Sequence, residues 1–213
     1  MVKEVVEGII LVLSCNKYLR TRLKKTAFRL KENSYENWKV VYVIGNLTIN
    51  EPYQLHTNLL TLKCEDSYIH LFKKLVKALE AIYSIYDIKQ GVLRTGDDLI
   101  FNETELRRFL LKTDKSHFIG RNFNGLSIKE PGPHLLTNNH RDTSMYQYYM
   151  IHKEDVLDPL HNLRSVDPRQ YIVSPKLPVG SVCAGPIFYL SNRATNILME
   201  HFKNVNYDVF TFN

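Results

Sequence analysis

The apolar positions in the first hundred residues form short continuous runs that alternate with segments of helical periodicity. The runs at residues 8–14, 39–44 and 91–95 have the length and composition of buried strands. Between them, residues 18–31 and 67–83 repeat an apolar position every three or four residues, which predicts amphipathic helices. This alternation is typical of an α/β protein with a mostly parallel central sheet flanked by helices.

The second half of the chain contains a further set of predicted elements. Asn102 and Glu105 have the spacing of a capping box, so we expect a helix over residues 102–112. Other patterns indicate strands at 116–123, 187–190 and 207–212 and a helix at 192–202. Residues 129–167 are polar, and we expect them to form a long irregular excursion. No linker or repeat divides the chain, so residues 1–213 are predicted to be a single domain.

The composition is that of a globular protein, with 44% hydrophobic and 23% charged residues. The apolar run near the N-terminus is too short for a signal peptide or a transmembrane helix. We therefore expect a soluble, cytoplasmic chain without a membrane segment. The three cysteines, Cys15, Cys64 and Cys183, are far apart and form no CxxC pair, which argues against a disulfide framework or a thiolate zinc site.

The formal net charge of +6 favours anionic partners such as nucleic acid, phosphorylated ligands or acidic surfaces. Six basic residues lie within positions 20–31, on a predicted amphipathic helix. A solvated helix face explains them, because a nucleic-acid groove usually carries interleaved aromatic residues and this segment has no such pattern. We therefore expect no nucleic-acid partner.

Two adjacent aspartates, Asp97 and Asp98, directly follow the predicted strand at 91–95 and Gly96. Neighbouring carboxylates repel each other unless a positive group compensates them. A turn before the next helix is one explanation. The other is a divalent cation at the carboxyl end of a strand, where α/β sheets bind ligands and where Mg²⁺ or Mn²⁺ is shared with substrate phosphates. This stretch alone leaves nucleotidyl transferases, phosphatases and nucleotide-sugar glycosyltransferases all open.

Four segments stand in a fixed order along the chain: EDSYIHLFKKLVKAL, VLRTGDDLIFNETELRRFL, LPVGSVCAGPIFYLSNRA and NYDVFTFN. Together with ILVLSCNKYLRTRLKKTAF near the N-terminus, they resemble the motifs of the β-1,3-galactosyltransferase and Fringe group, glycosyltransferase family 31. In that family three aspartates follow the strand, whereas Gly96 replaces the first of them here. The size and composition also resemble those of glycosyltransferase domains encoded by chlorella viruses.

The resemblance implies a single GT-A-like domain that moves a sugar from a nucleotide-sugar donor, a UDP-sugar, to a hydroxyl group. The acceptor would be a glycan or a glycoprotein, and the reaction would invert the donor carbon. The implied cofactor is Mn²⁺ or Mg²⁺, held by Asp98 with Asp97 beside it in a DXD-like motif, and Asp208 takes the position of the general base. The implied nucleotide-binding residues are Ser14, Cys15, Asn16, Asp66, Lys74, Arg94, Asp97 and Gly185.

Two other function classes stay open at this point. One is a Mg²⁺-dependent nucleotidyl or phosphoryl transferase, although the chain has neither a GxxxxGK[ST] nor a GxGxxG phosphate loop. The other is a basic module that binds nucleic acid or glycans without catalysis. A response to nucleotide sugars would separate the glycosyltransferase from both.

Overall fold

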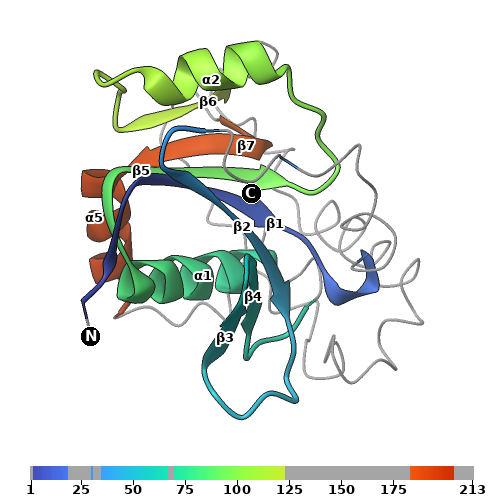
Figure 1. Ribbon diagram of the computed structural model, residues 1–213. Helices are drawn as coiled ribbons and strands as arrows, with labels where there is room; N and C mark the ends of the chain where they lie inside the picture. The colour runs from blue at the N-terminus through green and yellow to red at the C-terminus, as the bar shows by residue number, and fades with distance from the viewer. Residues whose placement is uncertain (1, 19–29, 31–34, 67–69, 123–182, 204–213) are drawn as a thin grey trace, which may run out of the picture.

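The computed structural model describes residues 2–18, 30, 35–66, 70–122 and 183–203, and all structural statements below concern these residues. They form a seven-stranded sheet in the order β3-β4-β2-β1-β5-β7-β6 (Figure 1). The strands are β1 (Glu4–Leu13), β2 (Trp38–Gly45), β3 (Tyr53–His56), β4 (Leu59–Leu62), β5 (Tyr86–Gly96), β6 (Phe118–Asn122) and β7 (Cys183–Ser191). The helices are the 3₁₀ turn η1 (Asn16–Tyr18), α1 (Leu71–Ile85), α2 (Glu103–Leu111) and α5 (Asn192–Phe202).

The sheet is mixed, which corrects the expectation of a mostly parallel one. Strands β4, β2, β1 and β5 form a parallel block. Strand β3 pairs antiparallel with β4, and β7 pairs antiparallel with both β5 and β6. Only Thr57 and Asn58 connect β3 to β4, and a parallel pair needs a crossover of about a dozen residues or more. That hairpin is therefore antiparallel by necessity.

Both faces of the central strands are buried, which explains why β1 and β2 appear in the sequence as continuous apolar runs. Successive side chains of β1 point to opposite faces of the sheet. Ile9 and Leu11 join the core that α1 and Met199 of α5 cover, while Ile10 and Val12 join the core under α2. Figure 1 shows the same arrangement, with α1 and α5 on one face and α2 on the other.

Several predicted elements are confirmed, one with the same bounds and others with shifted ends. The helix at 192–202 matches α5, and the strands predicted at 8–14 and 91–95 are extended toward their N-termini as β1 and β5. Sequence reasoning missed the short β3–β4 hairpin, whose four-residue strands carry little periodicity. None of the helices in the described part of the chain is long and apolar enough to cross a membrane.

Three predicted features lie outside the described residues. They are the helix at 18–31 (except for its first residue and Leu30), the polar excursion at 129–167 and the closing strand at 207–212. The predicted strand at 116–123 corresponds to β6, apart from its last position, which is also outside.

Asn102 caps α2, and we expect its loss to weaken the fold measurably. Its side-chain oxygen accepts hydrogen bonds from the backbone N–H groups of Thr104 (3.1 Å) and Glu105 (3.3 Å). Asn102→Ala should lower the free energy of unfolding in urea by about 1 kcal/mol, because two N–H groups lose their acceptor. Asn102→Asp keeps an acceptor oxygen, so its free energy of unfolding should fall much less. Equal losses in the two variants would contradict the capping role.

Candidate functional site

The carboxyl ends of β1, β2 and β5 meet at one edge of the sheet. Leu13, the last residue of β1, pairs with Val43 of β2 and with Gly96, the last residue of β5. The residues that follow these strands therefore lie next to one another. In α/β sheets this edge is the usual position of a ligand site.

A buried ion pair between Asp66 and Lys74 connects the turns at this edge, and we call it the Asp66–Lys74 clamp. The two residues are 1% and 2% exposed, and Lys74 Nζ lies 2.8 Å from Asp66 Oδ1. Asp66 Oδ1 also accepts from the backbone N–H of Gly45 (2.8 Å), and Oδ2 accepts from the N–H of Asn16. Lys74 Nζ donates to the carbonyl oxygen of Ser14 (2.5 Å). The clamp thus joins α1 to the turns after β1 and β2.

Gly45 is part of this arrangement, although sequence reasoning did not assign it to the site. A Cβ atom at position 45 would lie 2.8 Å from the carbonyl oxygens of both Cys64 and Glu65. These are backbone atoms, so they cannot move aside as a side chain would. The only sequence signal was a glycine that directly follows a buried strand. Its small size lets the Gly45 N–H reach Asp66.

The two adjacent aspartates have different environments. Asp97 is 7% exposed, and its Oδ2 accepts a hydrogen bond of 2.6 Å from the hydroxyl of Ser14, which is itself buried. Asp98 is exposed. A Cβ atom at Gly96 would lie 2.7 Å from Asp98 Oδ1, so the Asp98 carboxylate lies close over the glycine. Asp98 is therefore the carboxylate that solvent and ligands reach.

Cys15 lies beside the clamp with a free, half-exposed thiol. Burial, and after it the negative charge of Asp66, raise the pKa of the Cys15 thiol. The thiol therefore stays protonated at neutral pH, which suits neither a thiolate metal ligand nor a nucleophile. The carbonyl oxygen of Cys15 accepts from the N–H of Tyr18 (2.9 Å) and closes the short turn after β1.

Arg94 and Gly185 lie on the neighbouring strands of the same sheet. Arg94 is a buried residue of β5, and its guanidinium carbon lies 5.5 Å from the ring centroid of Phe188. In the pairing of β5 with β7, Thr95 is opposite Ile187. Gly185 lies two residues before Ile187 on β7, in the part of the strand where the pairing with β6 shifts register.

The structure brings together most of the residues that the sequence singled out. One connected group, joined by the contacts above, contains Ser14, Cys15, Asn16, Asp66, Lys74 and Asp97. Asp208 lies outside the described residues. Among the described residues, no three His, Cys, Asp or Glu side chains gather closely enough to hold a metal ion by themselves. A cation at this edge would therefore take few of its ligands from the described protein atoms.

An apolar groove of about 430 Å³ lies beside Asp98. Leu99, Ile100 and Phe101 form one wall directly after the aspartates, and Ile100 is 78% exposed. The other walls come from β5, α2, β6 and β7. The exposed carboxylate is thus bordered by an apolar surface on the side of α2.

One comparison with known proteins finds a family. The family model described as "Galactosyltransferase" matches residues 19–210, which is most of the chain and includes the clamp and both aspartates. A search of curated proteins gave no significant match.

We expect the Asp66–Lys74 clamp to be energetically coupled. Lys74→Met leaves a buried carboxylate without its cation, and removing one partner of a buried pair costs about 3–5 kcal/mol of unfolding free energy. Asp66→Asn should also lower the free energy of unfolding. In the double variant the decrease should be smaller than the sum of the decreases in the two single variants. Urea unfolding of the four proteins measures the coupling.

Lys73→Met is the matched control for this cycle. Lys73 is the neighbouring residue on α1, and it pairs with Glu65 at 2.9 Å with side chains 15% and 12% exposed. Because this pair keeps more contact with water, Lys73→Met should lower the free energy of unfolding clearly less than Lys74→Met does. Strict additivity of Asp66→Asn and Lys74→Met would rule out the clamp as a coupled pair.

Proposed function

The chain belongs to the galactosyltransferase family and is therefore a glycosyltransferase of the hexosyltransferase class, and we propose that it takes its sugar from a UDP-sugar. The acceptor in this proposal is a hydroxyl group of a glycan or glycoprotein. The observation that carries the proposal is the sheet edge at which an exposed carboxylate, Asp98, adjoins the buried group around Ser14 and Asp97. A nucleoside diphosphate is the ligand class that needs both a cation site and a structured pocket at such an edge.

The residues present fit Mg²⁺ or Mn²⁺. Both ions prefer oxygen ligands, and at phosphate sites they need only one or two protein carboxylates. Asp98 would hold the cation, since its carboxylate is exposed and Gly96 beside it has no side chain. When bound, the cation compensates the diphosphate charge and so improves the leaving group. Asp97 supports the turn from behind through its bond with Ser14.

The turn after β1 is the proposed contact for the uracil base and ribose. This turn consists of Ser14, Cys15 and Asn16. The clamp fixes it through hydrogen bonds to the carbonyl oxygen of Ser14 and the N–H of Asn16. Lys74 remains a predicted phosphate ligand, but its hydrogen bonds to the Ser14 carbonyl oxygen and to Asp66 support a positioning role as well. Arg94 and Gly185 lie on the adjacent strands, where a guanidinium and a bare backbone suit the phosphates.

The proposed reaction is an inverting displacement at the anomeric carbon of the donor sugar. The acceptor hydroxyl loses its proton to a general base while its oxygen bonds to that carbon, and UDP departs from the opposite face with the bonding electrons. Asp208 is the proposed base by its position in the family motif. The apolar groove beside Asp98 offers a surface for the apolar face of a sugar ring.

A panel of nucleotides tests the donor. In the presence of Mn²⁺, UDP should raise the thermal unfolding midpoint more than GDP, ADP or CMP at equal concentration. A ligand that binds only the native state stabilises it by RT ln(1 + [L]/Kd), so the shift ranks the affinities. Equal shifts for all four, or a preference for GDP, would contradict the UDP-sugar proposal.

Asp98→Asn and Asp208→Asn should separate binding from chemistry. Asp98→Asn keeps the shape of the turn but weakens the proposed cation ligand, so UDP binding should lose its dependence on Mn²⁺ and transfer should fall with it. Asp208→Asn should bind UDP with Mn²⁺ normally, while transfer falls by about 10²–10⁴-fold, as is typical for the loss of a general base. Calorimetric titration and a transfer assay on both variants decide the assignment.

The experiment tests the proposed roles of Asp98 and Asp208 independently. If Asp98→Asn binds UDP with undiminished Mn²⁺ dependence, the cation site lies elsewhere. If Asp208→Asn transfers sugar at the wild-type rate, a different group acts as the base. Glu103→Gln, a change on α2 beyond the cap, is the control for altered charge near the site.

A further inference from the structure

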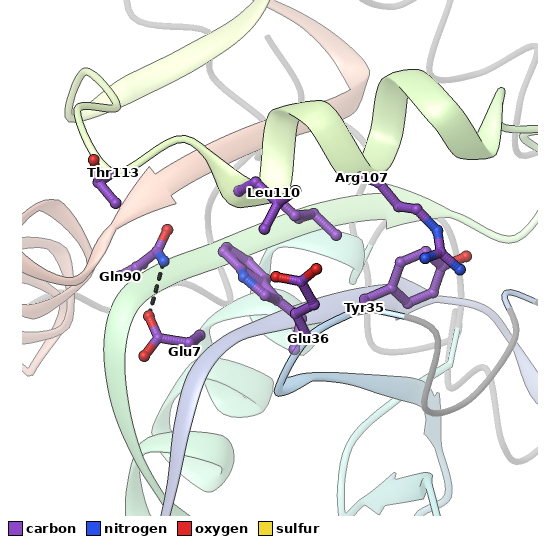
Figure 2. Close-up of a pocket in the computed structure, with 9 residues that line it drawn as sticks. Glu7, Tyr35, Glu36, Gln90, Arg107, Leu110 and Thr113 are labelled. Carbon is purple, nitrogen blue, oxygen red and sulfur yellow. Dashed lines mark hydrogen bonds between the residues drawn. The ribbon is translucent and has the colours of Figure 1, made fainter.

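A second cavity, of about 220 Å³, lies between the sheet and α2 (Figure 2). Its lining includes Glu7 of β1, Trp38 of β2, Gln90 of β5 and the last turn of α2. The pairing of Gly8 with both Trp38 and Gly91 puts these three strand positions at one level of the sheet. Gly91 precedes Gly96 by five residues, so the cavity is about 17 Å from the Asp98 edge at ~3.3 Å per strand residue.

The polar wall of this cavity is held in place by its own hydrogen bonds. The Gln90 side chain donates through Nε2 to Glu7 Oε2 (2.8 Å) and accepts at Oε1 from Lys115 Nζ (2.5 Å). Figure 2 shows the bond between Gln90 and Glu7 at one end of the cavity. Since both ends of the amide are engaged, its orientation is set before any ligand arrives. A pre-formed polar wall of this kind lowers the entropic cost of binding, because its side chains are already ordered.

The aromatic part of the lining is equally rigid. Trp38 is 4% exposed, and a Cβ atom at Gly8 would come within 2.3 Å of its ring, so the indole lies flat against the β1 backbone. The ammonium of Lys115 lies 5.3 Å from the centroid of the same ring. The indole is therefore a fixed, mostly buried part of the wall behind the Glu7 and Gln90 side chains.

Glu36 also lines the cavity, and its backbone has a conformation that is unfavourable for glutamate. The N–H of Trp38 donates to the carbonyl oxygen of Tyr35 (2.9 Å) and closes a tight turn, with φ of 43° at Glu36 and 67° at Asn37. Asparagine tolerates the left-handed region, whereas a residue such as glutamate is strained there and glycine is the natural choice. Strained residues of this kind concentrate at binding and catalytic positions.

The charges of the lining residues indicate the net charge of a ligand that would bind in the cavity. Two carboxylates, Glu7 and Glu36, are balanced by the guanidinium of Arg107, which also lines the cavity, and by the adjacent ammonium of Lys115. Figure 2 shows Arg107 beside Tyr35 at the end of the cavity away from Gln90, with Glu36 between them and Gln90. A phosphate would meet the two carboxylates, and a purely apolar ligand would offer no hydrogen bonds to the polar groups that line the cavity. A neutral ligand that carries many hydroxyl groups satisfies both the donors and the acceptors.

We propose that this cavity is a second carbohydrate site, which binds one neutral hexose residue of a glycan. The volume is that of a single sugar ring, Leu111 offers exposed apolar surface to its C–H groups, and Glu7, Glu36, Gln90 and Arg107 bond its hydroxyls. The site is separate from the sheet edge of the proposed transfer. It would hold a glycan residue several sugars away from the reacting hydroxyl, and it stands whether or not UDP is the donor nucleotide.

Titration of the full chain with methyl β-D-galactopyranoside and methyl β-D-glucopyranoside, followed by ligand-observed NMR, tests the proposal. At least one glycoside should bind saturably, and Arg107→Ala should weaken it at least tenfold. Arg108→Ala is the matched control, because Arg108 is the next residue on α2, is also exposed, and pairs with Glu105 at 3.0 Å instead of lining the cavity. It should leave the affinity unchanged.

Glu36→Gly separates a binding role from a structural one. It removes the carboxylate and also the backbone strain, so glycoside affinity should fall at least tenfold while Tm stays the same or rises by up to about 2–4 °C. A lowered Tm would show that Glu36 serves the fold and would overturn its role in binding.

Competition with UDP and Mn²⁺ locates the sugar. Under the proposal the glycoside stays bound when UDP with Mn²⁺ is added, because the two sites are at different ends of β5. Displacement by UDP would put the sugar in the donor site and overturn the proposal, as would equal losses in Arg107→Ala and Arg108→Ala. Absence of binding by both glycosides would overturn it as well. The comparison of Arg107→Ala with Arg108→Ala does not depend on the nucleotide. If UDP does not bind, the nucleotide that gives the largest thermal shift takes its place in the competition.

Discussion

The ion pair between Asp66 and Lys74 lies almost entirely out of water, and the geometry of the candidate site depends on it. A buried charge pair is tolerated only when its remaining hydrogen-bonding groups are satisfied, and here backbone groups from two turns supply those bonds. The same contacts that satisfy the charges therefore fix the turns after β1 and β2. Gly45 permits the arrangement, because any side chain at that position would collide with backbone carbonyls.

Two neighbouring carboxylates at the same edge have different surroundings. The hydroxyl of Ser14 holds Asp97 inside the protein, whereas Asp98 faces solvent over a glycine. A charge that is already bonded within the fold orders the turn, and the exposed charge next to it remains available to a cation. Under the proposed function, this difference leaves Asp98 as the carboxylate that holds the cation, although Gly96 stands where the resembling motif has an aspartate.

The two ends of the sheet offer different chemistry on one rigid support. One end joins the turns that follow parallel strands, which is where this class of sheet binds nucleotides. The other end carries a tight, strained turn and a cavity with balanced charges and a fixed indole ring. Both sites use residues held by the sheet and its helices, so their positions relative to each other are set by the length of β5.

Local pattern alone determined much of this protein: the buried runs, the cap at Asn102, the span of α5 and the motif order that points to the family. These features depend on residues close together in the chain, or on the order of motifs, and both are readable without coordinates. Tertiary structure decided that the sheet is mixed, that Lys74 is buried against Asp66, and that Asp97 turns inward while Asp98 does not. Each of these outcomes depends on a partner distant in sequence, such as Ser14 for Asp97, 83 positions away. Periodicity and spacing carry no information about such a partner, because long-range contacts arise only when the strands are side by side.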